Sequence, residues 1–172
     1  MKKTSLIIGG QRGIGKIIFK NLNKRGDTLF NVSRSKNLKK NSISADISTQ
    51  TGIDLIKKKL HNKKINNLIF AHRYRGSDTR DEYFVMVEAT SKLIEALNQN
   101  FSTNASIVII GSIASTTIVH DQNASYHYTR GALDTMVKYY ACALGSKKIR
   151  INCVQPTKIF KLKNKKFFLK KN

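Results

Sequence analysis

A glycine-rich segment between a short apolar run and a helical pattern is the feature that most constrains how this chain folds. Residues 6–8 are apolar, and the segment 9–15, Gly-Gly-Gln-Arg-Gly-Ile-Gly, leads directly into apolar residues at helical spacing. Glycines lack a Cβ, so the backbone can turn sharply and approach a pyrophosphate, which free N–H groups and the helix dipole then bind. The order of strand, glycine turn and helix predicts a dinucleotide-binding loop rather than a purely structural turn.

The rest of the chain repeats this alternation of strands and helices. Further apolar runs lie at 29–32, 43–47, 68–71, 107–110 and 149–154, and segments of helical period lie at 13–24, 53–60, 82–97 and 126–144. Such alternation is typical of a parallel sheet covered by helices on both faces. We therefore expect an α/β fold, a doubly wound, Rossmann-type parallel sheet of about six strands.

Length and charge set the domain organisation. The chain has 172 residues, with 32 Lys and Arg against 10 Asp and Glu, which gives a formal net charge of +22. We expect one domain over residues 1–157 and a basic C-terminal tail over 158–172, either a frayed terminus or an arm for a membrane surface or nucleic acid. Nucleic-acid binding by the whole chain is a remote alternative, because the basic residues are scattered and match no nucleic-acid motif.

Three absences limit the other classes of function. No run of about 18 apolar residues exists, so we expect no membrane span, and the apolar start is too short for a secretory signal. Cys142 and Cys153 lie in apolar periodic segments, which predicts inert buried thiols and a cytoplasmic protein. His72, His120 and His127 have no partners at ligand spacing, so we expect no metal site.

The glycine spacing is Gly-x-x-x-Gly-x-Gly, at Gly9, Gly13 and Gly15, and here the sequence resembles the short-chain dehydrogenase/reductase family. The resemblance spans residues 4 to about 157 and continues through Ala-Asp-Ile at 45–47, Ile-Gly-Ser at 110–112, Tyr-His-Tyr-Thr-Arg at 126–130 and Ile-Arg-Ile-Asn-Cys-Val-Gln-Pro at 149–156. It implies an oxidoreductase that transfers a hydride between a nicotinamide cofactor and a small-molecule carbonyl or secondary alcohol.

The charge around the second strand favours NADP over NAD. A 2′-phosphate on the adenosine ribose needs cations, whereas a bare 2′-hydroxyl prefers a carboxylate at this strand end. The strand ends at Ser33 and Arg34 without an acid, and Arg12 lies in the glycine loop. Each arginine alone could be a solvated surface residue, but two at one phosphate position predict NADP. The expected cofactor-binding residues are Gly9, Arg12, Gly13, Ile14, Gly15, Ser33, Arg34, Asp46, Ile47, Ala71 and Pro156. Of these, Asp46 and Ile47 are assigned to the adenine by the resemblance.

The resemblance also assigns the catalytic residues, with Tyr126 as the acid and Ser112 as the second donor to the substrate oxygen. A tyrosine with its usual pKa of about 10 needs a nearby cation to exchange protons readily. The family supplies a lysine four residues later, on the same helix face, and this chain has Arg130 there. Arg130 keeps the charge but has different geometry, so an alternative is a cofactor-binding protein with impaired catalysis.

The sequence differs from the family at three further places, and each difference leads to a prediction. Where the family commonly has Asn-Asn-Ala-Gly, residues 70–73 read Phe-Ala-His-Arg, which keeps the small Ala71. Residues 82–88 contain no asparagine, so the family's water-held proton relay is expected to be absent. The chain passes from Pro156 and Thr157 into the lysine-rich tail, so we expect an exposed sixth strand and an uncovered substrate pocket in a C-terminally short member.

A homo-oligomer is also expected, through the helices at 82–97 and 126–144. The apolar residues of these segments exceed what one sheet face requires, and many members of the family pair through them. They are Val85, Val87, Leu93, Ile94, Leu97, Met136, Val137 and Tyr140.

Overall fold

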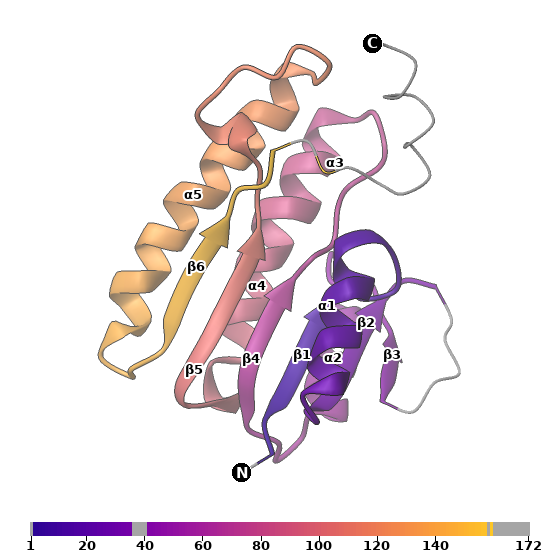
Figure 1. Cartoon of the computed structure of the whole chain (residues 1–172), viewed down its shortest axis with the longest axis vertical. Helices are drawn as coiled ribbons and strands as arrows, with labels where there is room; N and C mark the ends of the chain where they lie inside the picture. Colours follow the sequence, from indigo (N-terminus) through magenta and orange to yellow (C-terminus); the bar gives the residue numbers. More distant parts are fainter. Residues whose placement is uncertain (1, 36–40, 158, 160–172) are drawn as a thin grey trace.

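Six parallel strands form a single sheet in the computed structural model, which describes residues 2–35, 41–157 and 159 (Figure 1). Their order across the sheet is β3-β2-β1-β4-β5-β6. The strands are β1 (Thr4–Ile8), β2 (Thr28–Ser33), β3 (Ser42–Ser44), β4 (Ile65–Phe70), β5 (Phe101–Ile110) and β6 (Arg150–Val154). The predicted doubly wound Rossmann-type sheet is confirmed. Most of the predicted tail, residues 158–172, lies outside the described residues.

The helices lie on both faces of the sheet. They are α1 (Gly13–Lys24), α2 (Gln50–Lys59), α3 (Thr79–Tyr83), α4 (Ala89–Ala96) and α5 (Ala124–Gly145), with a π-helical turn (Phe84–Glu88) between α3 and α4. The crossover from β1 through α1 to β2 runs toward one edge of the sheet, and the crossovers from β4 to β5 and from β5 to β6, through α3, α4 and α5, run toward the other edge. Because such crossovers are right-handed, α1 lies on the face of the sheet opposite α3, α4 and α5. None of the described helices is both long and apolar enough to cross a membrane.

The main core lies between the sheet and the layer of α2, α4 and α5. Alternate residues of the central strands point into it, among them Leu6, Leu68 and Ile107, which are completely buried. In the described sheet, β6 is an edge strand, as predicted, and the side chain of Val154 is 50% exposed. The carboxyl ends of β1, β2, β4 and β5 therefore meet at one rim of a rigid sheet, where loops can hold functional side chains.

Two predictions about side-chain burial are wrong in part. Cys142 is exposed, because it lies on the outer face of α5, and Cys153 is only half-buried. Burial raises the pKa of the Cys153 thiol to about 12, and the neighbouring Asp134 carboxylate acts in the same direction.

The apolar residues on which we based the oligomer lie mostly in the core of the single chain. Val87, Leu93, Ile94, Leu97, Met136 and Tyr140 are buried there. Val85 and Val137 pack against the same core and are only partly buried. One sheet face and its neighbouring helices account for these side chains, so their number does not indicate a second subunit.

Candidate active site

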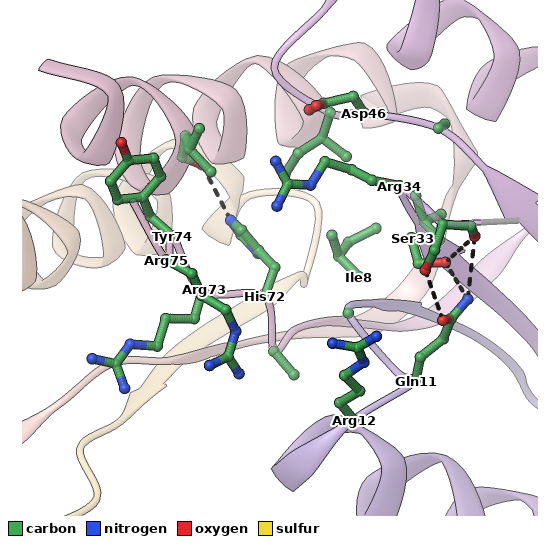
Figure 2. A pocket seen from close by; sticks show the side chains of 17 residues that line it. Ile8, Gln11, Arg12, Ser33, Arg34, Asp46, His72, Arg73, Tyr74 and Arg75 are labelled. Carbon is green, nitrogen blue, oxygen red and sulfur yellow. Dashed lines mark hydrogen bonds between the residues drawn. The ribbon is translucent and has the colours of Figure 1, made fainter. Parts of the chain in front are cut away.

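A cleft of about 300 Å³ opens at the carboxyl ends of β1, β2 and β4, on the rim of the sheet (Figure 2). This is the point where the strand order reverses, the usual ligand site of an open α/β sheet. Seven of the eleven predicted cofactor residues line this cleft: Gly9, Arg12, Ser33, Arg34, Asp46, Ile47 and Ala71.

The glycine loop has the close backbone approaches that its sequence predicts. Gly9 has a φ of +89°, and a Cβ there would lie 2.8 Å from the backbone N and Cα of His72. A Cβ on Gly15 would collide with the carbonyl oxygen of Gly9. The loop is also anchored to β2, because the Gly10 amide donates to Asn31 Oδ1 at 2.9 Å. Only glycine therefore fits at positions 9 and 15.

Gly13, Ile14 and Gly15 form the first turn of α1 and are not among the residues that line the cleft. Pro156 also lies away from it. Its carbonyl oxygen accepts a hydrogen bond from the Ile113 amide at 3.2 Å, beside the segment that follows β5. Contact of these four residues with a cofactor stays a prediction.

Positive charge surrounds the cleft. Arg12, at the start of α1, and Arg34, after β2, extend into it, and Arg73 and Arg75 line it from the segment after β4 (Figure 2). Among the described residues, none of the four guanidinium groups has a carboxylate within 4.0 Å. The cleft is therefore suited to an anionic ligand, since guanidinium groups bind phosphates and carboxylates through paired N–H donors.

Polar contacts hold the residues at the end of the cleft nearest β2 and β3. The Gln11 side-chain amide donates to Ser33 Oγ, and the Ser35 hydroxyl donates to Gln11 Oε1 at 3.0 Å. Asp46 Oδ1 accepts from the Ser48 amide at 2.9 Å and from the Ser48 hydroxyl at 2.6 Å. These bonds fix the cleft wall before any ligand binds.

His72 lines the cleft and contacts the π-helical turn, a contact that the sequence analysis did not predict. Its Nε2 lies 3.2 Å from the carbonyl oxygen of Val85, in the π-helical turn. A carbonyl can only accept, so Nε2 carries the proton and Nδ1 is an acceptor; Nδ1 is buried and has no partner among the described residues. Burial lowers the pKa of His72 to about 4, so the ring is neutral at physiological pH. Its place directly after β4 is the signal that could have identified it.

Ser112, Tyr126 and Arg130 come together, as the sequence predicts. Ser112 is buried just after β5, and Tyr126 and Arg130 lie one turn apart near the start of α5. The Cζ atom of Arg130 lies 4.4 Å from the Tyr126 ring centroid. Burial alone would raise the pKa of Tyr126, but the neighbouring Ser112 and Arg130 side chains and the positive charge of Arg73 bring it below its usual value. The arrangement favours a tyrosine that can give up its proton.

Glu82 is the second residue that the sequence analysis missed. It is buried in α3, and its Oε1 lies 3.9 Å from Nη2 of Arg130. The Ser125 hydroxyl donates to Glu82 Oε2 at 2.9 Å. Arg130 is 2% exposed, and its Nε and Nη1 are buried with no partner among the described residues. Glu82 thus balances the charge of Arg130 and leaves two of its nitrogens for a ligand.

A second cleft of about 460 Å³ lies beside the first. It shares Arg73, Tyr74 and Arg75 with the first cleft, and Tyr126 lines it together with residues 121–123. The two clefts therefore share the segment of residues 73–75 as a common wall.

Comparison with known proteins gives a consistent result. A family model described as Enoyl-(Acyl carrier protein) reductase matches residues 65–168. A tropinone reductase homolog of Arabidopsis thaliana is 29% identical over 199 residues, covering 90% of this chain and 68% of that protein. Elsinochrome reductase 1 of Elsinoe fawcettii is 27% identical over 188 residues, covering 90% and 67%. The fold matches a short chain dehydrogenase family protein from Francisella tularensis with a TM-score of 0.81 at 25% identity, covering 91% of this chain and 69% of that one.

Proposed function

Since the chain belongs to the short-chain dehydrogenase/reductase family, we propose that it is an NADP-dependent oxidoreductase that interconverts a carbonyl and a secondary alcohol. The observation that carries this proposal is the group of Ser112, Tyr126 and Arg130, of which Tyr126 lines the second cleft. Its chemistry matches what carbonyl reduction requires, an acid and a second donor for the substrate oxygen.

The residues present fit a nicotinamide dinucleotide. Seven of the expected cofactor residues line the first cleft, no protein atom lies within 4 Å of the Cβ position of Gly13, and the buried Nε and Nη1 of Arg130 have no partner among the described residues. In this proposal the glycine loop holds the pyrophosphate, and Arg12, Ser33 and Arg34 hold the 2′-phosphate. Asp46 and Ile47 hold the adenine, in line with the family resemblance. When bound, the nicotinamide supplies the hydride.

The protein residues supply the proton and the electrostatics. Tyr126 donates its hydroxyl proton to the substrate oxygen while the Ser112 hydroxyl donates a hydrogen bond to the same oxygen. The phenolate that forms is stabilised by the charge of Arg130. Because a guanidinium does not lose its proton in a protein, Arg130 acts as a fixed charge and not as a proton carrier.

The test compares the unmodified protein with Tyr126→Phe, using NADPH and the neutral ketone methyl benzoylformate. We expect the variant to lose at least about 100-fold in kcat while its NADPH affinity stays within about twofold, because the hydroxyl acts only as charge develops on the oxygen. Arg130→Lys restores the family's residue and is expected to keep or raise the activity, by up to about tenfold.

Two results would contradict the proposal. Activity that persists in Tyr126→Phe removes the assigned roles. NADPH binding without turnover in the unmodified protein and in Arg130→Lys favours the other candidate, a cofactor-binding protein without catalysis.

We also propose that the protein forms a homo-oligomer. Three tyrosines on α3 and α5 offer apolar area to the solvent: Tyr83 is 42% exposed, Tyr128 is 51% exposed and Tyr139 is 66% exposed. Exposed aromatic side chains are enriched where chains associate.

A further inference from the structure

We propose that the carbonyl substrate carries an anionic group, such as a carboxylate, which Arg73 and Arg75 bind beside Tyr126. This inference rests on the proposed oxidoreductase function and adds to it the chemical class of the substrate. It depends on the position, the charge and the partners of the two arginines.

Their position puts them in the same cleft as Tyr126. Arg73 and Arg75 follow β4 and line both clefts. The Cζ atom of Arg73 lies 5.4 Å from the ring centroid of Tyr126. A group that the Arg73 guanidinium binds would thus lie within the length of a small molecule from a carbonyl bound by Tyr126. The positive charge of Arg73 also contributes to the lowered pKa of Tyr126.

Neither arginine forms an ion pair with a described residue. Among residues 2–35, 41–157 and 159, neither arginine has a carboxylate within 4.0 Å. Two other arginines do have a carboxylate within 4.0 Å, since Arg25 pairs with Asp27 at 2.7 Å and Arg130 faces Glu82 at 3.9 Å. Two adjacent cations without a counter-ion repel each other, and an anionic ligand would remove that repulsion and make charge-assisted hydrogen bonds with both.

The second cleft is also lined by two carboxylates, those of Glu82 and Asp121. The charge of Glu82 is offset by Arg130. Asp121 is exposed and accepts from Gln122 Nε2 at 3.2 Å, and Gln122 Oε1 accepts from Arg73 Nη2 at 3.3 Å. Gln122 is therefore the neutral partner that a substrate anion would replace at Arg73. Asp121 confines the anion to the side of the cleft formed by the arginines.

The experiment uses a matched pair of ketones, benzoylformate and its neutral methyl ester, at saturating NADPH. The ratio of kcat/KM for the acid to that for the ester is measured in the unmodified protein, Arg73→Gln, Arg75→Gln and Arg73→Lys. The intrinsic difference in reactivity between the two ketones cancels when the ratio is compared across variants. Arg80→Gln is the matched control, because Arg80 is exposed on α3 and lines neither cleft.

We expect the ratio to fall about tenfold in each glutamine variant, to recover in part in Arg73→Lys and to stay unchanged in Arg80→Gln. Asp121→Asn is expected to raise the ratio, because it removes a negative charge from the second cleft. An unchanged ratio in both glutamine variants overturns the proposal. A loss of NADPH affinity without a change in the ratio also overturns the proposal, because the arginines would then bind the cofactor and not the substrate.

If neither ketone is reduced, the proposed function fails and a binding measurement decides the anion site separately. Benzoylformate is titrated calorimetrically into the protein saturated with NADP⁺. A Kd that rises about tenfold in Arg73→Gln and Arg75→Gln, but not in Arg80→Gln, supports the site. Binding that does not depend on these arginines, or no binding at all, overturns it.

Discussion

Glu82 shows how much of the candidate site depends on one buried carboxylate. It is the only acid within 4.0 Å of Arg130 among the described residues, and Ser125 holds its other oxygen. A buried guanidinium without a counter-ion is costly, because its desolvation is not repaid by attraction to a partner. Glu82 therefore allows an arginine to occupy the position where the family has a lysine, and we expect it to orient Arg130.

Replacing Glu82 by Gln should lower the free energy of unfolding by about 3 kcal/mol, because it leaves the charge of Arg130 buried and uncompensated. Thermal or urea denaturation measures the loss. Glu88→Gln is the matched control, since Glu88 also pairs with a cation, Lys92 at 3.3 Å, but on the surface. It should cost no more than about 0.5 kcal/mol.

A double-mutant cycle tests whether the loss of stability in Glu82→Gln comes from the lost interaction with Arg130. Glu82→Gln combined with Arg130→Gln should be less destabilising than the sum of the two single changes, because the double variant has no unpaired buried charge. Strict additivity would show that the two side chains do not interact. A kcat that is unchanged in Glu82→Gln, measured below its melting temperature, would remove the positioning role.

The start of α1 is the element on which the cofactor loop depends. A Cβ on Gly15 would collide with the Gly9 carbonyl oxygen and would lie 3.1 Å from Gly10 Cα. These are backbone atoms that cannot move without opening the loop. Gly15→Ala should therefore destabilise the fold by roughly 1–3 kcal/mol and weaken NADPH binding, as measured by denaturation and by calorimetry.

Gly145 provides the control for this prediction. It also lies in a helix, at the end of α5, but nothing lies within 4 Å of the Cβ that an alanine would add. Gly145→Ala should be neutral or stabilising, by up to about 1 kcal/mol, because it reduces the entropy of the unfolded chain. If both alanine variants have the same stability and NADPH affinity, the close approach of Gly15 to the loop has no energetic importance.

The elements were predictable where local rules govern them. The helix expected at 13–24 matches α1, because the glycine loop and the apolar period both mark its start. The helix expected at 53–60 begins three residues earlier, because the Thr49 hydroxyl accepts from the Gly52 amide and caps α2. The π-helical turn inside the helix expected at 82–97 was not predictable. One of its carbonyls, that of Val85, is bonded to His72 from another element.

The residues of the candidate site also fall into those that the sequence indicated and those that only the fold revealed. Gly9, Tyr126 and Ser112 follow strands or begin helices at family spacing, so sequence position alone indicated them. Glu82 and His72 act through partners far along the chain, Arg130 and Val85, and no local pattern marks such a pair. Arg73 and Arg75 were visible as residues after a strand, but only the fold shows that they share a cleft with Tyr126.

At the scale of the whole molecule, positive charge and cofactor choice are connected. The formal net charge is +22, and the four cleft arginines add a local concentration of cations at one rim of the sheet. Such a field attracts anions and favours the more highly charged of two otherwise similar ligands. NADPH differs from NADH by one phosphate, so the preference between them measures whether Arg12 and Arg34 form a phosphate site.

Cofactor binding to the folded chain alone raises its stability by mass action, by about 2.7 kcal/mol at a concentration 100 times Kd. For a chain of this size that corresponds to a rise of roughly 5–10 °C in the melting temperature. We expect NADPH to produce this shift at a concentration where NADH gives a smaller one, and Arg34→Asp to reverse the order, because a carboxylate repels the 2′-phosphate and accepts from a free 2′-hydroxyl. Arg80→Asp makes the same charge change outside the cleft and should preserve the order. Equal shifts with both cofactors in the unmodified protein would falsify the NADP assignment. A shift order that is reversed equally by both variants would trace the preference to overall charge instead of Arg34.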